Sequence, residues 1–167
     1  DRTGPVRVEG RGVYPLEGIY DVPVEYDFMC EYANGVRMRV ANRSKQPKGM
    51  GTCWYGDKGW IHVRRGSLTA SDENILKEEI GEGEIKLYKS DSHQRNFIDC
   101  IRSRKETITP AEVALRSISV ALLGEIAMLT EEKLEWDVEN ERIVNNEQAN
   151  RLLLKPFRNP WNHNMLK

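Results

Sequence analysis

The sequence predicts an α+β fold. Strand-like alternation of apolar and polar residues dominates the chain up to Ala70, whereas helical spacing of apolar residues begins after Asp91. Strands in the first part and helices in the second are typical of α+β proteins. We expect one domain over residues 1–167, because 39% of the residues are hydrophobic and domains usually have about 100–200 residues.

A β-hairpin is the clearest local feature. The segments Val24–Tyr32 and Val36–Val40 flank Asn34-Gly35, a pair of residues that favours tight hairpin turns. Val36, Met38 and Val40 should share one side of their strand. Further strands are expected at residues 6–9, 52–55, 60–64 and 67–70, and shorter ones at 134–136 and 142–144.

The longest predicted helix begins at Thr109. Thr109 can cap this helix, Pro110 suits its first turn, and Glu112 can reach back to complete a capping box. The helix should end near Thr130 and bury a stripe of apolar residues against the sheet. The expected stripe consists of Ala114, Leu115, Ile118, Ala121, Leu122, Ile126 and Leu129. Other helices are expected from Asp91, with Phe97, Ile98 and Ile101 on its apolar side, and over residues 146–154.

Composition excludes several classes of protein. The chain has 25 Lys+Arg against 26 Asp+Glu, so it lacks the basic excess of a protein that binds nucleic acid through phosphates. Cys30, Cys53 and Cys100 are odd in number and widely spaced, which argues against a disulfide framework or a metal site and fits a reducing compartment. We therefore predict a cytoplasmic protein, with the periplasm as an alternative. No apolar stretch reaches the ~18–20 residues of a membrane helix, so no membrane association is expected.

The glycine pattern of a dinucleotide site is incomplete. Such a site needs Gly-x-Gly-x-x-Gly, because only glycine lets backbone N–H groups approach the pyrophosphate. Three Gly-x-Gly pairs occur, and the third position holds Pro15, Trp54 or Lys86 in each case. The pairs are Gly10/Gly12, Gly49/Gly51 and Gly81/Gly83. We predict no cofactor site within this chain.

The three histidines are the candidate catalytic side chains of this sequence. His62, His93 and His163 are candidate general bases. His62 lies between two β-branched residues, so we expect it to be an ordinary residue of a sheet. His93 is expected to form hydrogen bonds at the start of a helix. His163 is expected to lie in an exposed tail. We predict no catalytic residue and no metal ligand.

Two segments are candidates for substrate binding. Arg11, Tyr14 and Tyr20 lie in a Gly/Pro-rich stretch after the first strand, where aromatic and guanidinium groups can bind sugar hydroxyls. Arg43 belongs to the loop 42–48, whose three cations can hold a carboxylate or a phosphate. A plain surface turn is the alternative for that loop.

Several motifs together resemble the C-terminal domain of the Gfo/Idh/MocA oxidoreductases, the nicotinamide-dependent family named for glucose-fructose oxidoreductase and inositol dehydrogenase. Their order along the chain is more specific than any one of them. The motifs are Tyr32-Ala33-Asn34-Gly35-Val36, Gly56-Asp57-Lys58-Gly59-Trp60-Ile61-His62-Val63, the segment from His93 to Lys105, Leu134-Glu135-Trp136-Asp137, Ala149-Asn150-Arg151-Leu152-Leu153 and Arg158-Asn159-Pro160-Trp161.

The resemblance implies one large, mostly antiparallel β-sheet with helices packed on one of its faces, and it also implies the role of the chain. In this family an N-terminal Rossmann domain binds NAD or NADP and supplies the lysine of a Glu-Lys-Pro motif, and an Asp-x-x-x-His pair opens the C-terminal domain. This sequence has neither motif, so we expect both before Asp1. The chain is then the substrate-binding and oligomerisation domain of a sugar or polyol oxidoreductase, not catalytic by itself.

Two alternatives remain open. The same superfamily includes NAD-dependent glycosidases, and a free-standing α+β binding or scaffold module would have the same composition.

The resemblance also implies a homo-oligomer formed through the open face of the sheet. We expect aromatic and apolar residues on that face, with Trp54 or Trp60 as its anchor.

Overall fold

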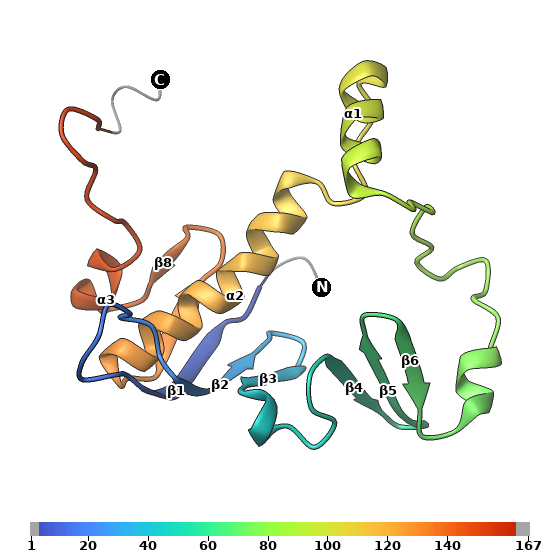
Figure 1. Cartoon of the computed structure of the whole chain (residues 1–167), viewed down its shortest axis with the longest axis horizontal. Coiled ribbons are helices and arrows are strands. Elements are labelled where there is room, and N and C mark those ends of the chain that lie inside the picture. Colours follow the sequence, from blue (N-terminus) through green and yellow to red (C-terminus); the bar gives the residue numbers. More distant parts are fainter. Residues whose placement is uncertain (1–3, 163–167) are drawn as a thin grey trace. The chain divides into compact units, whose positions relative to one another are not determined.

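The computed structural model describes residues 4–162, which contain antiparallel sheets and helices joined by turns and irregular segments (Figure 1). This confirms the predicted α+β class. The contacts divide the described residues into two units. Unit 1 contains the residues up to Asn42 together with those from Glu112 onward, and unit 2 contains Arg43–Ala111.

Unit 1 is built on a five-stranded antiparallel sheet, the large sheet, in the order β3-β2-β1-β7-β8. The predicted hairpin joins β2 to β3, and its turn contains Gly35 at a φ of 84°. The Asn34 side chain accepts a hydrogen bond from the backbone N–H of Val36 at 3.1 Å, which holds the turn. The strands are β1 Arg7–Val13, β2 Glu25–Glu31, β3 Arg37–Ala41, β7 Leu134–Asp137 and β8 Arg142–Ile143.

Helix α2, Ala111–Thr130, covers one face of the large sheet and ends where the sequence predicts. Its buried residues all lie in the second half, from Leu123 to Met128. They join a core to which the sheet contributes Val8 and Phe28. The rest of this core consists of Cys30, Leu134, Ile143 and Ala149, the last from the short helix α3, Glu147–Arg151. Burial raises the pKa of the Cys30 thiol to about 11.

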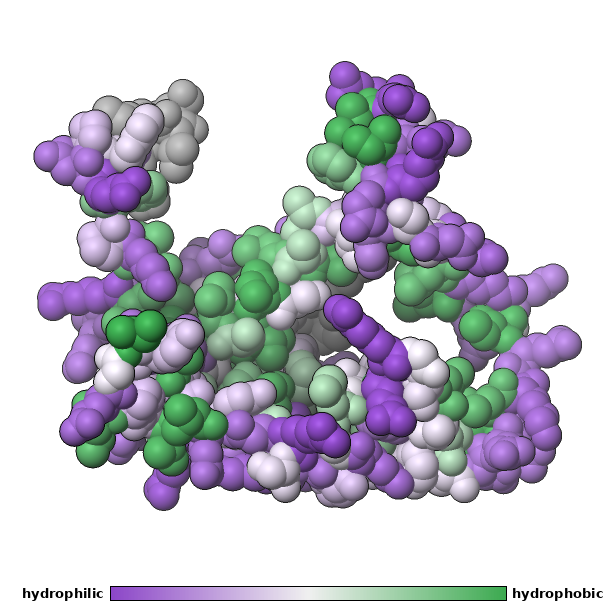
Figure 2. Space-filling view, viewed as in Figure 1, coloured by the Kyte–Doolittle hydropathy of each residue, from purple (hydrophilic) through white to green (hydrophobic). Residues whose placement is uncertain are grey.

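The buried face of α2 differs from the predicted stripe. Of its larger members, Ile126 is buried, but Leu115, Ile118, Leu122 and Leu129 are 42–52% exposed. Hydrophobic residues accordingly gather on the surface over α2 in Figure 2. The helix is apolar on nearly all sides, so periodicity alone does not select the face that meets the sheet. Gly124 decides it, because a Cβ at this position would lie 2.5 Å from the Phe28 ring.

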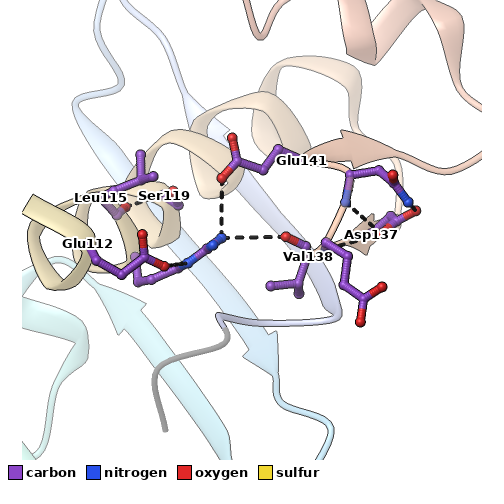
Figure 3. Close-up of polar contacts among 9 residues, drawn as sticks. Glu112, Leu115, Ser119, Asp137, Val138 and Glu141 are labelled. Atoms are coloured by element: carbon purple, nitrogen blue, oxygen red, sulfur yellow. Dashed lines mark hydrogen bonds and ion pairs between the residues drawn. The ribbon is translucent and has the colours of Figure 1, made fainter.

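The first turns of α2 are tied to the β7–β8 hairpin through Arg116 (Figure 3). Its Nε lies 2.8 Å from the Glu112 carboxylate, and its Nη1 lies 3.4 Å from Glu141 and 3.5 Å from the carbonyl oxygen of Val138. The predicted capping box would instead have turned Glu112 back toward the start of the helix. The ion pair with Arg116 is the contact that forms, and the helix begins at Ala111.

The prediction that no stretch approaches a membrane helix was wrong in one respect. Helix α2 is long and apolar enough to cross a membrane by length and composition alone. The core helix of a soluble protein passes the same test, and the second half of α2 is packed on the large sheet. Its apolar character is therefore accounted for, in part, by core packing.

The open face of the large sheet, turned away from α2, carries ion pairs. Arg39 donates two hydrogen bonds to the Asp27 carboxylate, at 2.9 and 2.6 Å. Arg7 lies 3.7 Å from Glu31 and 3.6 Å from Glu135. The open face is less apolar than predicted, because the residues that alternate outward on β1, β2 and β3 are mostly charged, with Val13 and Met29 among the few apolar ones.

Unit 2 begins with a second antiparallel sheet, the small sheet, in the order β4-β5-β6. It pairs the predicted strands 52–55 and 60–64 as a hairpin and contains both Trp54 and Trp60, so neither tryptophan belongs to the large sheet. The strands are β4 Thr52–Gly56, β5 Gly59–Arg64 and β6 Ser67–Ala70. Two 3-10 turns flank it, η1 Arg43–Lys45 and η2 Glu73–Lys77.

Helix α1, His93–Ser103, completes unit 2. The Ser92 side chain caps it by accepting from the N–H of Arg95, and His93 is its first residue. Asn96 holds the segments on either side of the helix together. Its Nδ2 donates to the Tyr88 hydroxyl at 2.9 Å, and its Oδ1 accepts from the N–H of Ile108 at 3.1 Å.

Candidate functional site

A pocket rich in positive charge lies in unit 2, and we call it the cationic pocket. It has a volume of about 410 Å³, within the range of about 300–1,000 Å³ usual for small-molecule sites. Four of its seven lining residues carry a positive charge, and the other three are glycine or methionine. The lining consists of Arg43, Lys48, Gly49, Met50, Gly51, Arg64 and Arg65.

Strand β5 lies against the loop that precedes β4 and contributes Arg64 to the pocket. Trp60, His62 and Arg64 alternate with Ile61 and Val63, so these three side chains share one face of the small sheet. The ammonium group of Lys48 lies 3.5 Å from the centre of the Trp60 ring. This cation–π contact holds the loop over the strand.

Two glycines let the loop approach β5 closely. Gly49 and Gly51 have φ values of 72° and 128°, which side chains rarely adopt. A Cβ on Gly51 would collide with the carbonyl oxygen of Val63 and lie 2.6 Å from His62 Nε2. This Gly-x-Gly pair therefore shapes the cationic pocket.

His62 lies behind Gly51, which lines the pocket, and is not itself among the lining residues. It is only 7% exposed, and its Nε2 has no hydrogen-bond partner in the described part of the chain. A buried imidazole nitrogen without a partner is costly.

The four cations of the pocket are not neutralised by carboxylates. Among residues 4–162, no ion pair joins Arg43, Lys48, Arg64 or Arg65 to an acidic side chain. No acidic residue is among the described residues that line the pocket. The pocket consequently has a strong local positive charge, although the whole chain has a net charge of −1.

The residues predicted to bind substrate do not form one cluster. All of them except Arg43 belong to unit 1. Arg11 is exposed and lines a shallow hollow of about 280 Å³ beside β1, together with Glu9 and Lys133. Tyr20 is 74% exposed in the loop that follows. Arg43 lies in the cationic pocket of unit 2. A role in substrate binding stays a prediction for each of them.

Tyr14 has the most distinctive surroundings of the predicted residues. Its hydroxyl is buried and has no hydrogen-bond partner in the part of the chain that the structure describes. Burial, reinforced by the charge of Glu125, raises the pKa of this phenol. Its ring lies beside Gly12, on the α2 side of β1, whereas Arg11 alternates to the open face.

Sequence reasoning did not connect His62, Arg64 and Arg65 with the loop around Arg43. A usable signal was present, because pairing Thr52 with Val63 brings Gly51 opposite Arg64 in the hairpin.

His93 lies at a helix start as predicted, and His163 lies outside the described residues.

The remaining Gly-x-Gly pairs have other positions in the fold. Gly10 and Gly12 lie inside β1, and Gly81 and Gly83 lie in the irregular segment between η2 and α1. In a dinucleotide site the glycines join a strand to the start of a helix. None of these pairs does so.

Comparison with known proteins agrees with the resemblance seen in the motifs. A search among curated proteins found no match. Residues 69–163 match the family described as oxidoreductase family, C-terminal alpha/beta domain, of the Gfo/Idh/MocA proteins. This match covers more than half of the 167 residues. The chain therefore belongs to the C-terminal alpha/beta domain family of the Gfo/Idh/MocA oxidoreductases.

Proposed function

We propose that this chain is the substrate-binding and oligomerisation domain of a nicotinamide-dependent oxidoreductase that acts on sugars or polyols. A separate Rossmann domain would bind NAD or NADP and present its nicotinamide to the substrate. The match to the C-terminal domain family over residues 69–163 carries this proposal. The positions of the Gly-x-Gly pairs, none of which joins a strand to a helix, support it.

The proposed substrate surface lies around the end of β1 in unit 1. Arg11 offers a guanidinium group beside a polar hollow, and forked N–H donors suit vicinal hydroxyls. Tyr14 lies on the other side of this end of β1, facing α2. Arg11 would donate to the hydroxyls of a polyhydroxy ligand in the hollow.

We expect the chain to bind neutral polyols without binding the nucleotide. Titration with myo-inositol and glucose, followed by NMR, should give saturable shifts for the amides around Arg11 and Tyr14. Calorimetry with NAD and NADP should give no heat of binding at micromolar concentrations. Micromolar binding of either nucleotide to this chain, or polyol shifts that exclude β1, would contradict the proposal.

The oligomerisation part of the proposal rests on the open face of the large sheet. Its alternating charges suit pairing with a second copy, because opposite charges can meet across a two-fold axis. We expect sedimentation equilibrium to show a dimer or a larger assembly. Arg39→Glu should weaken association about tenfold, as expected for the loss of a charge-assisted contact, whereas Arg102→Glu on α1 should leave it unchanged. A monomer at high concentration and low salt would refute this part.

A further inference from the structure

We infer that the cationic pocket is a binding site for an oxoanion, the carboxylate or phosphate group of a small molecule. This inference goes beyond the proposed function, because it concerns unit 2 and an anionic group instead of neutral hydroxyls. It rests on two separate observations: four cations without acidic partners line the pocket, and Lys48 and Gly51 hold its loop against β5.

The charge arrangement selects for an anion. Arg43 and Lys48 come from the loop, whereas Arg64 and Arg65 come from the end of β5 and the turn that follows it. These four cations are exposed, so they repel one another only weakly in water, and an anion between them would gain favourable interactions with each. Guanidinium groups bind carboxylates and phosphates through two parallel hydrogen bonds, so three arginines suit either group.

The pocket is also held in place before any ligand arrives. Lys48 packs on the Trp60 ring, and Gly51 packs against His62 and Val63. The loop is therefore fixed against β5 at two points, which lowers the entropy lost on binding. A plain surface turn, the alternative for this loop, would not need either contact.

His62 supports the pocket from behind. Its Nε2 lies next to the backbone of Gly51, which lines the pocket. The His62 ring therefore reports on changes at Gly51 when an anion binds.

The volume sets the size of the ligand. About 410 Å³ is more than a free phosphate or carboxylate needs and suits a compound of monosaccharide size. We expect a phosphate monoester to bind more tightly than a carboxylate, because it carries up to two negative charges.

Titration of the whole chain with four probes tests the site: inorganic phosphate, glucose 6-phosphate, glucuronate and glucose. We expect the amides of Gly49 and Gly51 and the His62 ring to shift in NMR with the anionic probes only. Saturation by the phosphates alone assigns a phosphate site, saturation by glucuronate alone assigns a carboxylate site, and either result supports the inference. Absence of saturable shifts at these residues with every anion would overturn it.

Matched variants distinguish binding in the cationic pocket from a general attraction of anions to the positive charges of the chain. Arg64→Gln/Arg65→Gln should weaken the binding of glucose 6-phosphate by about tenfold or more, because it removes charge-assisted hydrogen bonds. Arg102→Gln/Lys105→Gln removes two cations elsewhere in unit 2 and should change affinity less than about twofold. Equal losses in both variants would overturn the inference. If the double variant does not fold, Arg43→Gln replaces it, because Arg43 lies outside the small sheet. Its affinity for glucose 6-phosphate is then compared with that of the control variant.

Discussion

Leu123→Ala should lower the free energy of unfolding by about 2–5 kcal/mol, whereas Leu122→Ala should cost about 1 kcal/mol or less. The two leucines are neighbours in α2, but Leu123 is 2% exposed in the core and Leu122 is 50% exposed. Removing the Leu123 side chain forfeits its transfer free energy and leaves a cavity against the large sheet. Both substitutions change the helix propensity by nearly the same amount, so the two variants control for each other.

Urea denaturation followed by far-UV circular dichroism measures this difference. The sequence-based expectation was the reverse, with Leu122 in the buried stripe. A larger loss for Leu122→Ala would mean that α2 meets the sheet through its other face, contrary to the core around Phe28.

Gly10→Ala should destabilise the protein by about 2–3 kcal/mol, near the upper end for overpacking. Gly10 lies on β1 opposite Phe28 of β2, and a Cβ on it would collide with the Phe28 Cβ. It would also lie 2.7 Å from the Asp27 carbonyl oxygen and from the Phe28 Cα. These are backbone atoms of a paired strand, so the clash cannot be relieved by rotating a side chain.

Gly83→Ala is the matched control for Gly10→Ala. A Cβ on Gly83 would meet no atom within 4 Å, so this variant should be neutral or slightly stabilising. Thermal unfolding of both variants makes the comparison. Similar melting temperatures for the two would show that β1 and β2 can separate at Gly10 at little cost.

Local sequence signals predicted much of the secondary structure. Asn34-Gly35 marks the β2–β3 turn because few other residues adopt its backbone angles easily. Ser92 marks the start of α1, and the hairpin around Gly56–Gly59 is present as expected. Each of these features depends on residues within a few positions of one another.

The candidate site was only partly predictable. The three cations of the loop 42–48 are visible in the sequence, and two of them, Arg43 and Lys48, line the cationic pocket. Arg64 and Arg65 join them only because the hairpin pairs β4 with β5. His62 was correctly predicted in a strand, but its lack of a hydrogen-bond partner depends on contacts across that sheet.

The sequence by itself determined the α+β class, most of the strands and helix ends, and the family to which the chain belongs. Only the tertiary structure decided which face of α2 is buried, that the open face is charged, and which cations meet around Gly51. Helix and strand signals are local, since they arise from backbone preferences and short-range periodicity. Burial and charge clustering depend on contacts between residues far apart in the chain, and an all-round apolar helix such as α2 is compatible with more than one such arrangement.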